Sequence, residues 1–519
     1  MRITTNKNRH RVAIIGGGFC GLSVMAHLVR TAKAGDHSVD IVLFDPSEGV
    51  GGAVFRETLP DTYLLNHEAD SMGAVNPYSA EAQNDDFYLW LQQNKHRHLS
   101  GQRFTGTIAR RYKNFDLDDP KAYLPRNLYG VYLEQRYKDL GKAAANTDIN
   151  ILHKRVSVDD IAQEQGGWNV VSTSGKEFFD IVVLSTGSRY PKGEPGMLQS
   201  QYPESFLGND TSTPAKSVAL LGSSLSAVEA ALSLANMGHS EITLYSRNRR
   251  LPKVRGEAKA YKPALSLAKL EAACGPDGLI PLGTLARLLK EEFDRAYKGH
   301  GGHYQNKGIN WVEVLENRDP LMQLTQDIDI ATSEQEIRWR SVIFSFLDLE
   351  VAMWERLSLD DKRYVLDRYC SLLLSYLAPM PLPQARLLRR YLGEGTIRLR
   401  GVTAYERSDA GWRITEGNGA SQQYDCLIDA RGPLWDVSDT PLIRRLLDSG
   451  VLTRHTFGGV EVESSTFRAI GSDKKVHAGL YAAGAPVFGA RPLQTSTLFY
   501  ADFCRTVARS IDRAVFSKG

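Results

Sequence analysis

Apolar runs and a helical repeat alternate at the start of the chain. Residues 12–15 are continuously apolar, which is typical of a strand buried on both faces of a parallel sheet. Residues 41–44 form a second such run. Between them, beyond a glycine-rich turn, apolar side chains return at helical spacing and predict an amphipathic helix through Leu22, Met25, Ala26 and Val29. The order of strand, turn, helix and strand predicts a βαβ unit.

The same order recurs in the middle of the chain. Residues 217–221 and 241–245 are apolar runs that predict strands, and residues 227–237 between them predict a helix. Three further apolar strands, each ending at glycine, are predicted over residues 180–187, 425–432 and 479–484.

Helical spacing dominates between residues 251 and 400. Residues 340–357 and 361–377 each predict a helix, and the proline-rich residues 378–383 predict a rigid turn after the second. We therefore expect a helical insertion over about residues 251–400.

The first glycine turn has the spacing of a dinucleotide-binding loop. Gly16, Gly18 and Gly21 fit G-x-G-x-x-G directly after the first strand, and Asp45 ends the second strand. Gly16 permits the tight turn, Gly18 allows a pyrophosphate to approach, and Gly21 lets helix and strand pack closely. The helix N-terminus would hold the phosphates, and Asp45 would accept hydrogen bonds from ribose hydroxyls. A second glycine turn at residues 49–52 is typical of FAD enzymes, so we expect FAD here.

The second glycine turn is degenerate and is followed by basic residues. Ser224 and Ala227 replace the second and third glycines after Gly222. At the position of Asp45 the chain has Ser246 followed by arginines, which would bind a 2′-phosphate, so the pattern predicts NADPH at Arg247 and Arg249. An exposed basic turn, or a decayed unit that no longer binds nucleotide, remains an alternative.

Together these patterns predict an α/β protein with two Rossmann-like dinucleotide-binding domains, for FAD and NADPH, and a helical insertion. The expected first part of the FAD domain is residues 1–190. The NAD(P) domain, with its insertion, covers residues 191–424. Residues 425–519 are the C-terminal return to the FAD domain.

Composition adds mainly exclusions. A net charge of +3 over 519 residues gives no reason to expect a nucleic-acid partner. The polar N-terminus, the absence of a long apolar run and five scattered cysteines favour a cytoplasmic protein that neither spans nor binds a membrane. His300 and His303 lack cysteine or acidic neighbours in the sequence, so we expect no metal site. Oligomeric state is left open.

Several motifs resemble a known family. They are residues 14–21, 63–66 with Met72, 86–91, 125–133 and 339–342 with Trp354. The chain resembles the bacterial FAD/NAD(P)-binding oxidoreductases, and more distantly the flavin-dependent N-hydroxylating monooxygenases. Asp180, Leu184, Thr186 and Gly187 match a motif of the N-hydroxylases, whereas Arg431 departs from the later copy of it. The resemblance also implies that Val156 lies in the strand whose backbone contacts the adenine.

Two nucleotide sites suggest that NADPH reduces FAD, which passes electrons on. The resemblance implies a monooxygenase that uses molecular oxygen and a flavin C4a-hydroperoxide to hydroxylate a small-molecule substrate, an amine or amino-acid derivative. An FAD oxidase or dehydrogenase with a structural second domain, and a non-enzymatic, redox-responsive flavin-binding protein, remain alternatives. A disulfide reductase would need paired cysteines beside the flavin, and the sequence has no C-x-x-C.

The expected binding residues form two sets, and catalytic residues are not assigned. For FAD they are Gly16, Gly18, Phe19, Cys20, Gly21, Asp45, Pro46, Gly52, Asn66, Met72, Val156, Thr186, Gly187 and Gly484. For NADPH they are Gly222, Ser223, Ser224, Leu225, Ser226, Arg247 and Arg249. Asn66, Arg491 and Gln494 are candidates for contact with the flavin ring.

Overall fold

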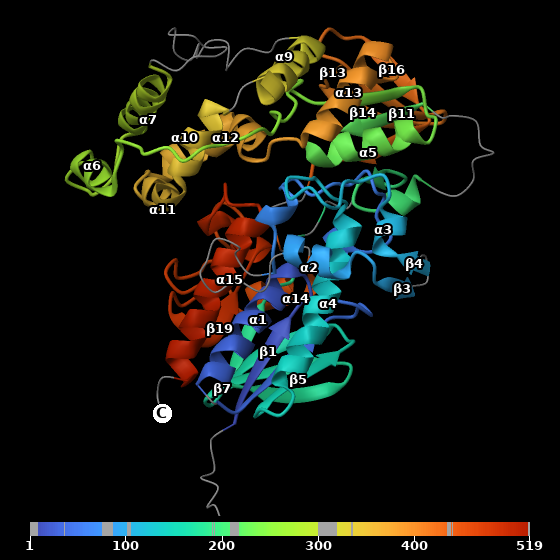
Figure 1. Cartoon of the computed structure of the whole chain (residues 1–519). Helices are drawn as coiled ribbons and strands as arrows, with labels where there is room; N and C mark the ends of the chain where they lie inside the picture. The colour runs from blue at the N-terminus through green and yellow to red at the C-terminus, as the bar shows by residue number, and fades with distance from the viewer. Residues whose placement is uncertain are drawn as a thin grey trace, which may run out of the picture. The chain divides into compact units, whose positions relative to one another are not determined.

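The chain divides into two units that each have their own parallel sheet. The computed structural model describes residues 9–35, 37–74, 87–100, 105–188, 190, 193–207, 217–298, 319–333, 336–432, 437 and 440–516. Unit 1 consists of Met1–Lys192 and Pro433–Gly519, and unit 2 of Gly193–Gly432. The fold is therefore mixed α/β with two dinucleotide-type sheets, as the sequence predicts (Figure 1).

The sheet of unit 1 has the strand order β18-β19-β9-β1-β2-β5. Only the pairing of β18 with β19 is antiparallel. The strands are β1 (His10–Ile15), β2 (Val39–Phe44), β5 (Ile149–Lys154), β9 (Ile181–Leu184), β18 (Arg468–Ile470) and β19 (Val476–Ala482). Because β19 pairs with β9, the C-terminal return strand lies in the first sheet, which confirms the prediction for residues 479–484.

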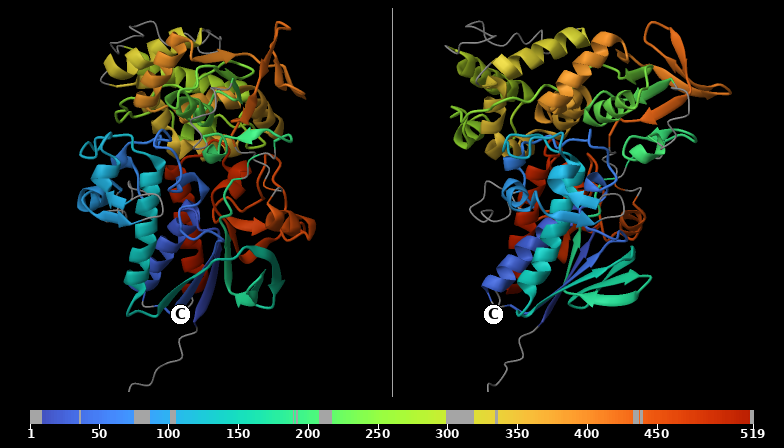
Figure 2. Two further views of the ribbon diagram at one scale, coloured as in Figure 1. Left: turned by 90° about the vertical axis from the view of Figure 1, so that its right-hand side faces the viewer. Right: turned by 45° about the vertical axis from the view of Figure 1, so that its right-hand side comes forward.

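Helices from both ends of the sequence pack together in unit 1. The first helix, α1 (Phe19–Ala34), lies against α15 (Thr497–Ile511) and α4 (Arg126–Ala144) (Figures 1 and 2). Leu28 of α1 and Val507 of α15 are both fully buried in the core that also contains β1. The apolar stripe read from the sequence is thus the face that closes the core.

Smaller elements complete unit 1. An antiparallel sheet links β6 (Val158–Glu164), β7 (Gly167–Ser172) and β8 (Gly175–Phe179). Unit 1 also contains α2 (Phe87–Asn94), α3 (Ile108–Arg111), α14 (Pro441–Asp448), and the strands β3 (His98–Ser100) and β4 (Thr105–Thr107).

The sheet of unit 2 is wholly parallel, with the order β10-β17-β11-β12-β13. Its strands are β10 (Leu198–Gln199), β11 (Val218–Leu221), β12 (Ile242–Tyr245), β13 (Ile397–Arg400) and β17 (Cys426–Asp429). The helices α5 (Leu225–Asn236) and α13 (Leu382–Glu394) pack beside this sheet. A three-stranded antiparallel sheet, orange in Figure 2, is made by β14 (Ala404–Ser408), β15 (Gly411–Thr415) and β16 (Ser421–Tyr424).

Two of the expected boundaries are wrong. The strand β17 pairs with β11, so the chain returns to unit 1 after Gly432 and not at residue 425. The strand β13 pairs with β12, so residues 397–400 belong to the second sheet and not to the helical insertion. The apolar run at β17 predicts a strand, but only its hydrogen-bonded neighbour decides which sheet receives it. At β13 the sequence predicts no strand, because apolar residues there alternate with arginines.

The helical region contains shorter helices than expected. Its members are α6 (Leu267–Ala272), α7 (Leu282–Tyr297), α9 (Pro320–Ser333), α10 (Arg338–Ser345), α11 (Leu347–Glu355) and α12 (Leu359–Leu377). The single helix expected over residues 340–357 is broken at Phe346. The Phe346 side chain is buried in the small core formed with Leu270 and Leu285, and the chain turns to place it there. Helix α12 confirms the prediction for residues 361–377.

Candidate functional site

The first glycine loop is closed so tightly that side chains cannot enter it. Gly16 has φ +110°, and a Cβ there would overlap the Ser185 carbonyl oxygen. A Cβ on Gly21 would overlap the carbonyl oxygen of Gly16. The N-cap, Gly18, provides no side-chain cap for α1. The N–H groups at the start of this 16-residue helix therefore receive no side-chain cap from Gly18, which leaves them able to bind an anion.

Asp45 links the loop to the end of β2. Its Oδ2 accepts a hydrogen bond from Gly17 N at 2.6 Å, and its Oδ1 accepts one from Ser47 N at 2.8 Å. An ionised carboxylate has about four acceptor positions, so both oxygens retain capacity for ribose hydroxyls. Pro46, which follows, is exposed.

The second glycine turn lies across the first. Gly51 N donates to Gly17 O at 2.8 Å, and Gly18 and Gly51 form an isolated parallel bridge. Gly52 has φ +73°, and a Cβ there would lie 3.1 Å from the Cα of Gly18. The structure thus brings two glycine turns into backbone contact, through residues 33 and 34 positions apart, as a cofactor crossing both would require.

Two glycines from distant segments complete this end of the sheet. Gly484, after β19, has φ +78°, and a Cβ there would lie 2.6 Å from Cys20 Sγ. Gly187, after β9, has φ +72° and faces open space. The neighbouring Thr186 Oγ1 is buried without a hydrogen-bond partner among the described residues. An unpaired buried hydroxyl is costly, so this atom indicates a polar ligand.

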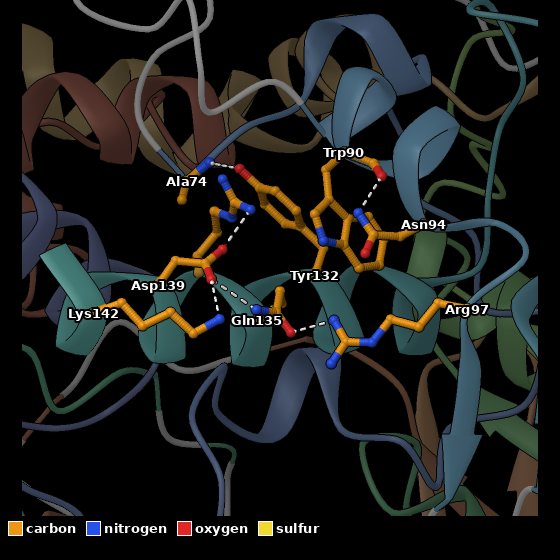
Figure 3. Close-up of polar contacts among 9 residues, drawn as sticks. Ala74, Trp90, Asn94, Arg97, Tyr132, Gln135, Asp139 and Lys142 are labelled. Carbon is orange, nitrogen blue, oxygen red and sulfur yellow. Dashed lines mark hydrogen bonds and ion pairs between the residues drawn. The ribbon is translucent and has the colours of Figure 1, made fainter.

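The segment that contains Met72 is held by hydrogen bonds to two tyrosines of α4. Tyr129 Oη donates to Gly73 O at 2.8 Å, and Ala74 N donates to Tyr132 Oη at 2.8 Å (Figure 3). The Met72 side chain is buried, and its sulfur accepts from Thr497 Oγ1 at 3.7 Å. The structure thus places Met72 beside the start of α15.

We expect Tyr132→Phe to lower the free energy of unfolding by about 1–3 kcal/mol, because the buried Ala74 N–H would lose its acceptor. The control is Tyr88→Phe, which removes an exposed hydroxyl bonded to Asp118 O and should change stability by less than about 0.5 kcal/mol. Urea denaturation measures both. Equal losses would contradict the assignment.

The remaining expected FAD residues are placed less uniformly. Asn66 is half-buried, and its Oδ1 lies 2.9 Å from His67 Nδ1. Val156 lies just after β5, in the turn before β6, so its expected place in a strand is wrong, whereas its contact with the adenine stays a prediction. The turn forms because Val156 N donates back to Lys154 O at 2.9 Å.

The other two candidates for contact with the flavin ring, Arg491 and Gln494, have contacts within the protein. Arg491 donates to Ser464 O at 3.2 Å and lies over the ring of Phe467. Gln494 is buried, and its N–H donates to Arg491 O at 3.2 Å. Contact with a flavin stays a prediction for both.

One pair of cysteines escapes sequence reasoning. Cys504 Sγ donates to the carbonyl oxygen of Cys20 at 3.4 Å, although 484 residues separate them. Both cysteines are free thiols. Complete burial raises the pKa of Cys504 well above its usual value, which makes it a poor nucleophile. Burial therefore argues against disulfide-reductase chemistry at this pair.

The second glycine loop keeps the backbone path of the first despite its substitutions. Gly222 has φ +121°, close to Gly16, and a Cβ there would lie 2.5 Å from Ala430 O. Ser224 has φ −83° and ψ −173°, and Gly18 has φ −73° and ψ −173°. Serine therefore adopts the glycine conformation without strain, and its exposed side chain caps nothing. Ala227, at the third glycine position, lies in α5 and is fully buried.

Three residues after β12, which are Ser246, Arg247 and Arg249, have no side-chain hydrogen bond or ion pair with any residue that the structure describes. Ser246 Oγ, at the position of Asp45, is buried without a hydrogen-bond partner in the described part of the chain. Arg247 and Arg249 are exposed and form no ion pair with any described residue. Ser223 Oγ donates to Arg250 O at 2.6 Å and holds this turn against the glycine loop. Leu225 and Ser226 form the first turn of α5.

Arg431 is a feature of this loop that sequence reasoning noted only as a departure. Its guanidinium donates to the buried Asp429 carboxylate at 2.6 Å, and this hydrogen bond raises the pKa of Arg431. The pair lies at the end of β17, beside Gly222. It fixes the strand end at the position where Arg431 departs from the N-hydroxylase motif.

The residues present fit two nucleotide cofactors. Each loop has a glycine cradle that a Cβ would fill, an uncapped helix N-terminus and a buried hydroxyl without a partner. No group of three or more His, Cys, Asp or Glu that could hold a metal occurs among the described residues, and His300 and His303 lie outside them. No described helix is long and apolar enough to cross a membrane.

Comparison with known proteins agrees with this geometry. Residues 13–189 match a family of FAD-NAD(P)-binding domains. Trimethylamine monooxygenase of Pelagibacter ubique (strain HTCC1002) is 26% identical over 46% of this chain, which spans about half (51%) of that relative. The uncharacterized protein YdhS of Escherichia coli (strain K12) is 23% identical over 75% of this chain and 82% of its own.

A solved structure shows the same fold. The ornithine N-hydroxylase of Kutzneria sp. 744, in its FADred–NADP+–L-orn form, superposes with a TM-score of 0.55 at 15% identity, over 97% of this chain and 99% of that one. Residues 13–189 are therefore similar to the FAD-NAD(P)-binding family, and the chain has the fold of flavoproteins with two dinucleotide-binding domains.

Proposed function

We propose that the protein is an FAD-dependent, NADPH-using monooxygenase that hydroxylates a small amine or amino-acid derivative. The observation that carries this proposal is the chemical difference between two loops of the same backbone path. The first loop is followed by a carboxylate, Asp45. The second is followed by Ser246 and by Arg247 and Arg249, which form no ion pair with any described residue.

The first loop would hold FAD. Gly16, Gly18 and the N-terminus of α1 would accommodate the pyrophosphate, and Asp45 would accept hydrogen bonds from the ribose. Thr186 Oγ1 has no partner among the described residues and would hydrogen-bond to the cofactor. Gly484, from the C-terminal strand, keeps a side chain out of the space beside Cys20.

The second loop would hold NADPH. A carboxylate at this place would repel a 2′-phosphate, whereas the Ser246 hydroxyl and the guanidinium groups of Arg247 and Arg249 would bind it. The uncapped N-terminus of α5 would face the pyrophosphate.

Together, the two bound cofactors would supply two-electron transfer from NADPH through FAD to molecular oxygen. Two similar proteins support the amine substrate class: the trimethylamine monooxygenase and the ornithine N-hydroxylase.

We expect the FAD-loaded protein to oxidise NADPH faster when a suitable amine or amino acid is added in air. Absorbance at 340 nm and mass spectrometry of the products measure this. A hydroxylated product formed in step with NADPH oxidation would support the proposal. Unchanged NADPH use across the panel would favour an oxidase or dehydrogenase, and a flavin that NADPH cannot reduce would favour a redox-responsive binding protein.

A further inference from the structure

A basic pocket lies in unit 1 between the end of α15 and the turn before β18. Its volume is about 520 Å³, within the range of small-molecule sites. Three arginines and five hydroxyl groups line it, and none of its nine lining residues is acidic. The arginines are Arg468, Arg509 and Arg513.

A strained turn forms one wall. Phe467 has φ +60°, which is unfavourable for an aromatic residue and costs on the order of 1–3 kcal/mol. Its ring is buried and lies 5.1 Å from that of Phe503 in α15. Phe467 N and Thr466 N both donate to Glu463 O, at 2.8 and 3.2 Å. These contacts hold Thr466 and Arg468 toward α15.

The opposite wall is one face of α15. Cys504, Val507 and Ile511 lie on the buried face of this helix. Arg509 lies on the other face of α15, and Arg513 lies about one turn further along, in the π-helix Asp512–Phe516 that follows it; both arginines are exposed. The pocket is therefore on the side of α15 away from the core residues that pack with α1.

The charge of the pocket is only partly neutralised by the protein. Arg468 forms an ion pair with Glu463 at 2.9 Å, and hydrogen bonds from Thr466 and Arg468 lower the pKa of Glu463. Arg513 forms no ion pair with a described residue. Ser510 Oγ lies 3.4 Å from Tyr481 Oη, so neutral hydrogen-bonding groups stand beside the cations.

We propose that this pocket binds the phosphate group of a small phosphomonoester. Guanidinium groups bind phosphate in pairs of parallel hydrogen bonds, and the hydroxyls supply further donors. The volume leaves room for an organic portion the size of a sugar. None of its lining residues belongs to either glycine loop, so the site does not depend on the proposed function.

The test is isothermal titration calorimetry of the full-length protein with ribose 5-phosphate, in saturating FAD and NADP+, with ribose as the unphosphorylated comparison. We expect a Kd below about 1 mM for ribose 5-phosphate and no heat with ribose. In the double variant Arg509→Gln/Arg513→Gln, we expect the Kd to rise at least about tenfold. Both arginines are exposed, and a circular dichroism melt checks that the variant is folded.

Two controls locate the binding. Arg505→Gln, in the same helix but paired with Asp502 outside the pocket, should leave the Kd within about twofold of wild type. Arg247→Ala/Arg249→Ala should also leave it unchanged. Loss of binding in this last variant would place the phosphate at the second glycine loop and overturn the proposal, as would the absence of heat in the wild-type protein.

Discussion

Protein carrying Gly16→Val is expected to purify without FAD. Valine at φ +110° is strained by on the order of 1–3 kcal/mol, and its Cβ would also overlap the Ser185 carbonyl oxygen. The loop would have to move away from β9, which removes the close approach that a pyrophosphate needs. We expect FAD affinity to fall at least about 100-fold. The flavin absorbance of the purified protein, with and without added FAD, measures this.

Two glycine variants separate cofactor loss from backbone strain. Gly166→Val introduces valine at φ +86° in the β6–β7 turn, where no atom lies within 4 Å, and should keep its FAD. Gly222→Val creates the matching overlap in the second loop, with Ala430 O, and should keep FAD while losing NADPH binding. Full flavin content in Gly16→Val would show that the first loop does not hold FAD.

The double variant Arg247→Ala/Arg249→Ala is expected to raise the KM for NADPH by about 10- to 100-fold while changing the KM for NADH less than about threefold. Each hydrogen bond to a charged group contributes about 1.5–3 kcal/mol, and no described residue forms an ion pair with either arginine that would compete with the phosphate. NADH has no 2′-phosphate, so it serves as the internal control. Steady-state rates with both cofactors provide the measurement.

A variant of another exposed arginine tests whether the loss of any positive charge would raise the KM for NADPH. Arg363, exposed in α12 and paired with Asp360, should tolerate replacement by alanine without altering either KM. If Arg247→Ala/Arg249→Ala changed both KM values equally, the arginines would be only an exposed basic turn. That result would leave the FAD assignment untouched.

The second glycine loop illustrates how a degenerate motif can retain its geometry. Judged by its letters, the second loop lacks two of the three glycines. Ser224 nevertheless has the φ and ψ of Gly18, because those angles are extended and open to any residue. Only Gly222, at φ +121°, occupies a conformation that requires glycine, and it is kept. Which glycines are essential is therefore a question of backbone angles.

The sequence by itself determined the local units. Apolar runs, the spacing of Gly16, Gly18 and Gly21, and the residue after each second strand predicted both βαβ units, since these features depend on contacts within about 30 residues. The return of the last strand to the first sheet was also predicted, from a short apolar run ending in glycine.

Tertiary structure alone decided which distant segments meet. The sheet that receives β17, the approach of Gly484 to Cys20, and the pairing of Cys20 with Cys504 join residues separated by hundreds of positions. The basic pocket likewise depends on Phe467 packing against Phe503, which no local pattern reveals. Such contacts are selected by the packing of whole faces, so a residue's type predicts its chemistry but not its neighbours.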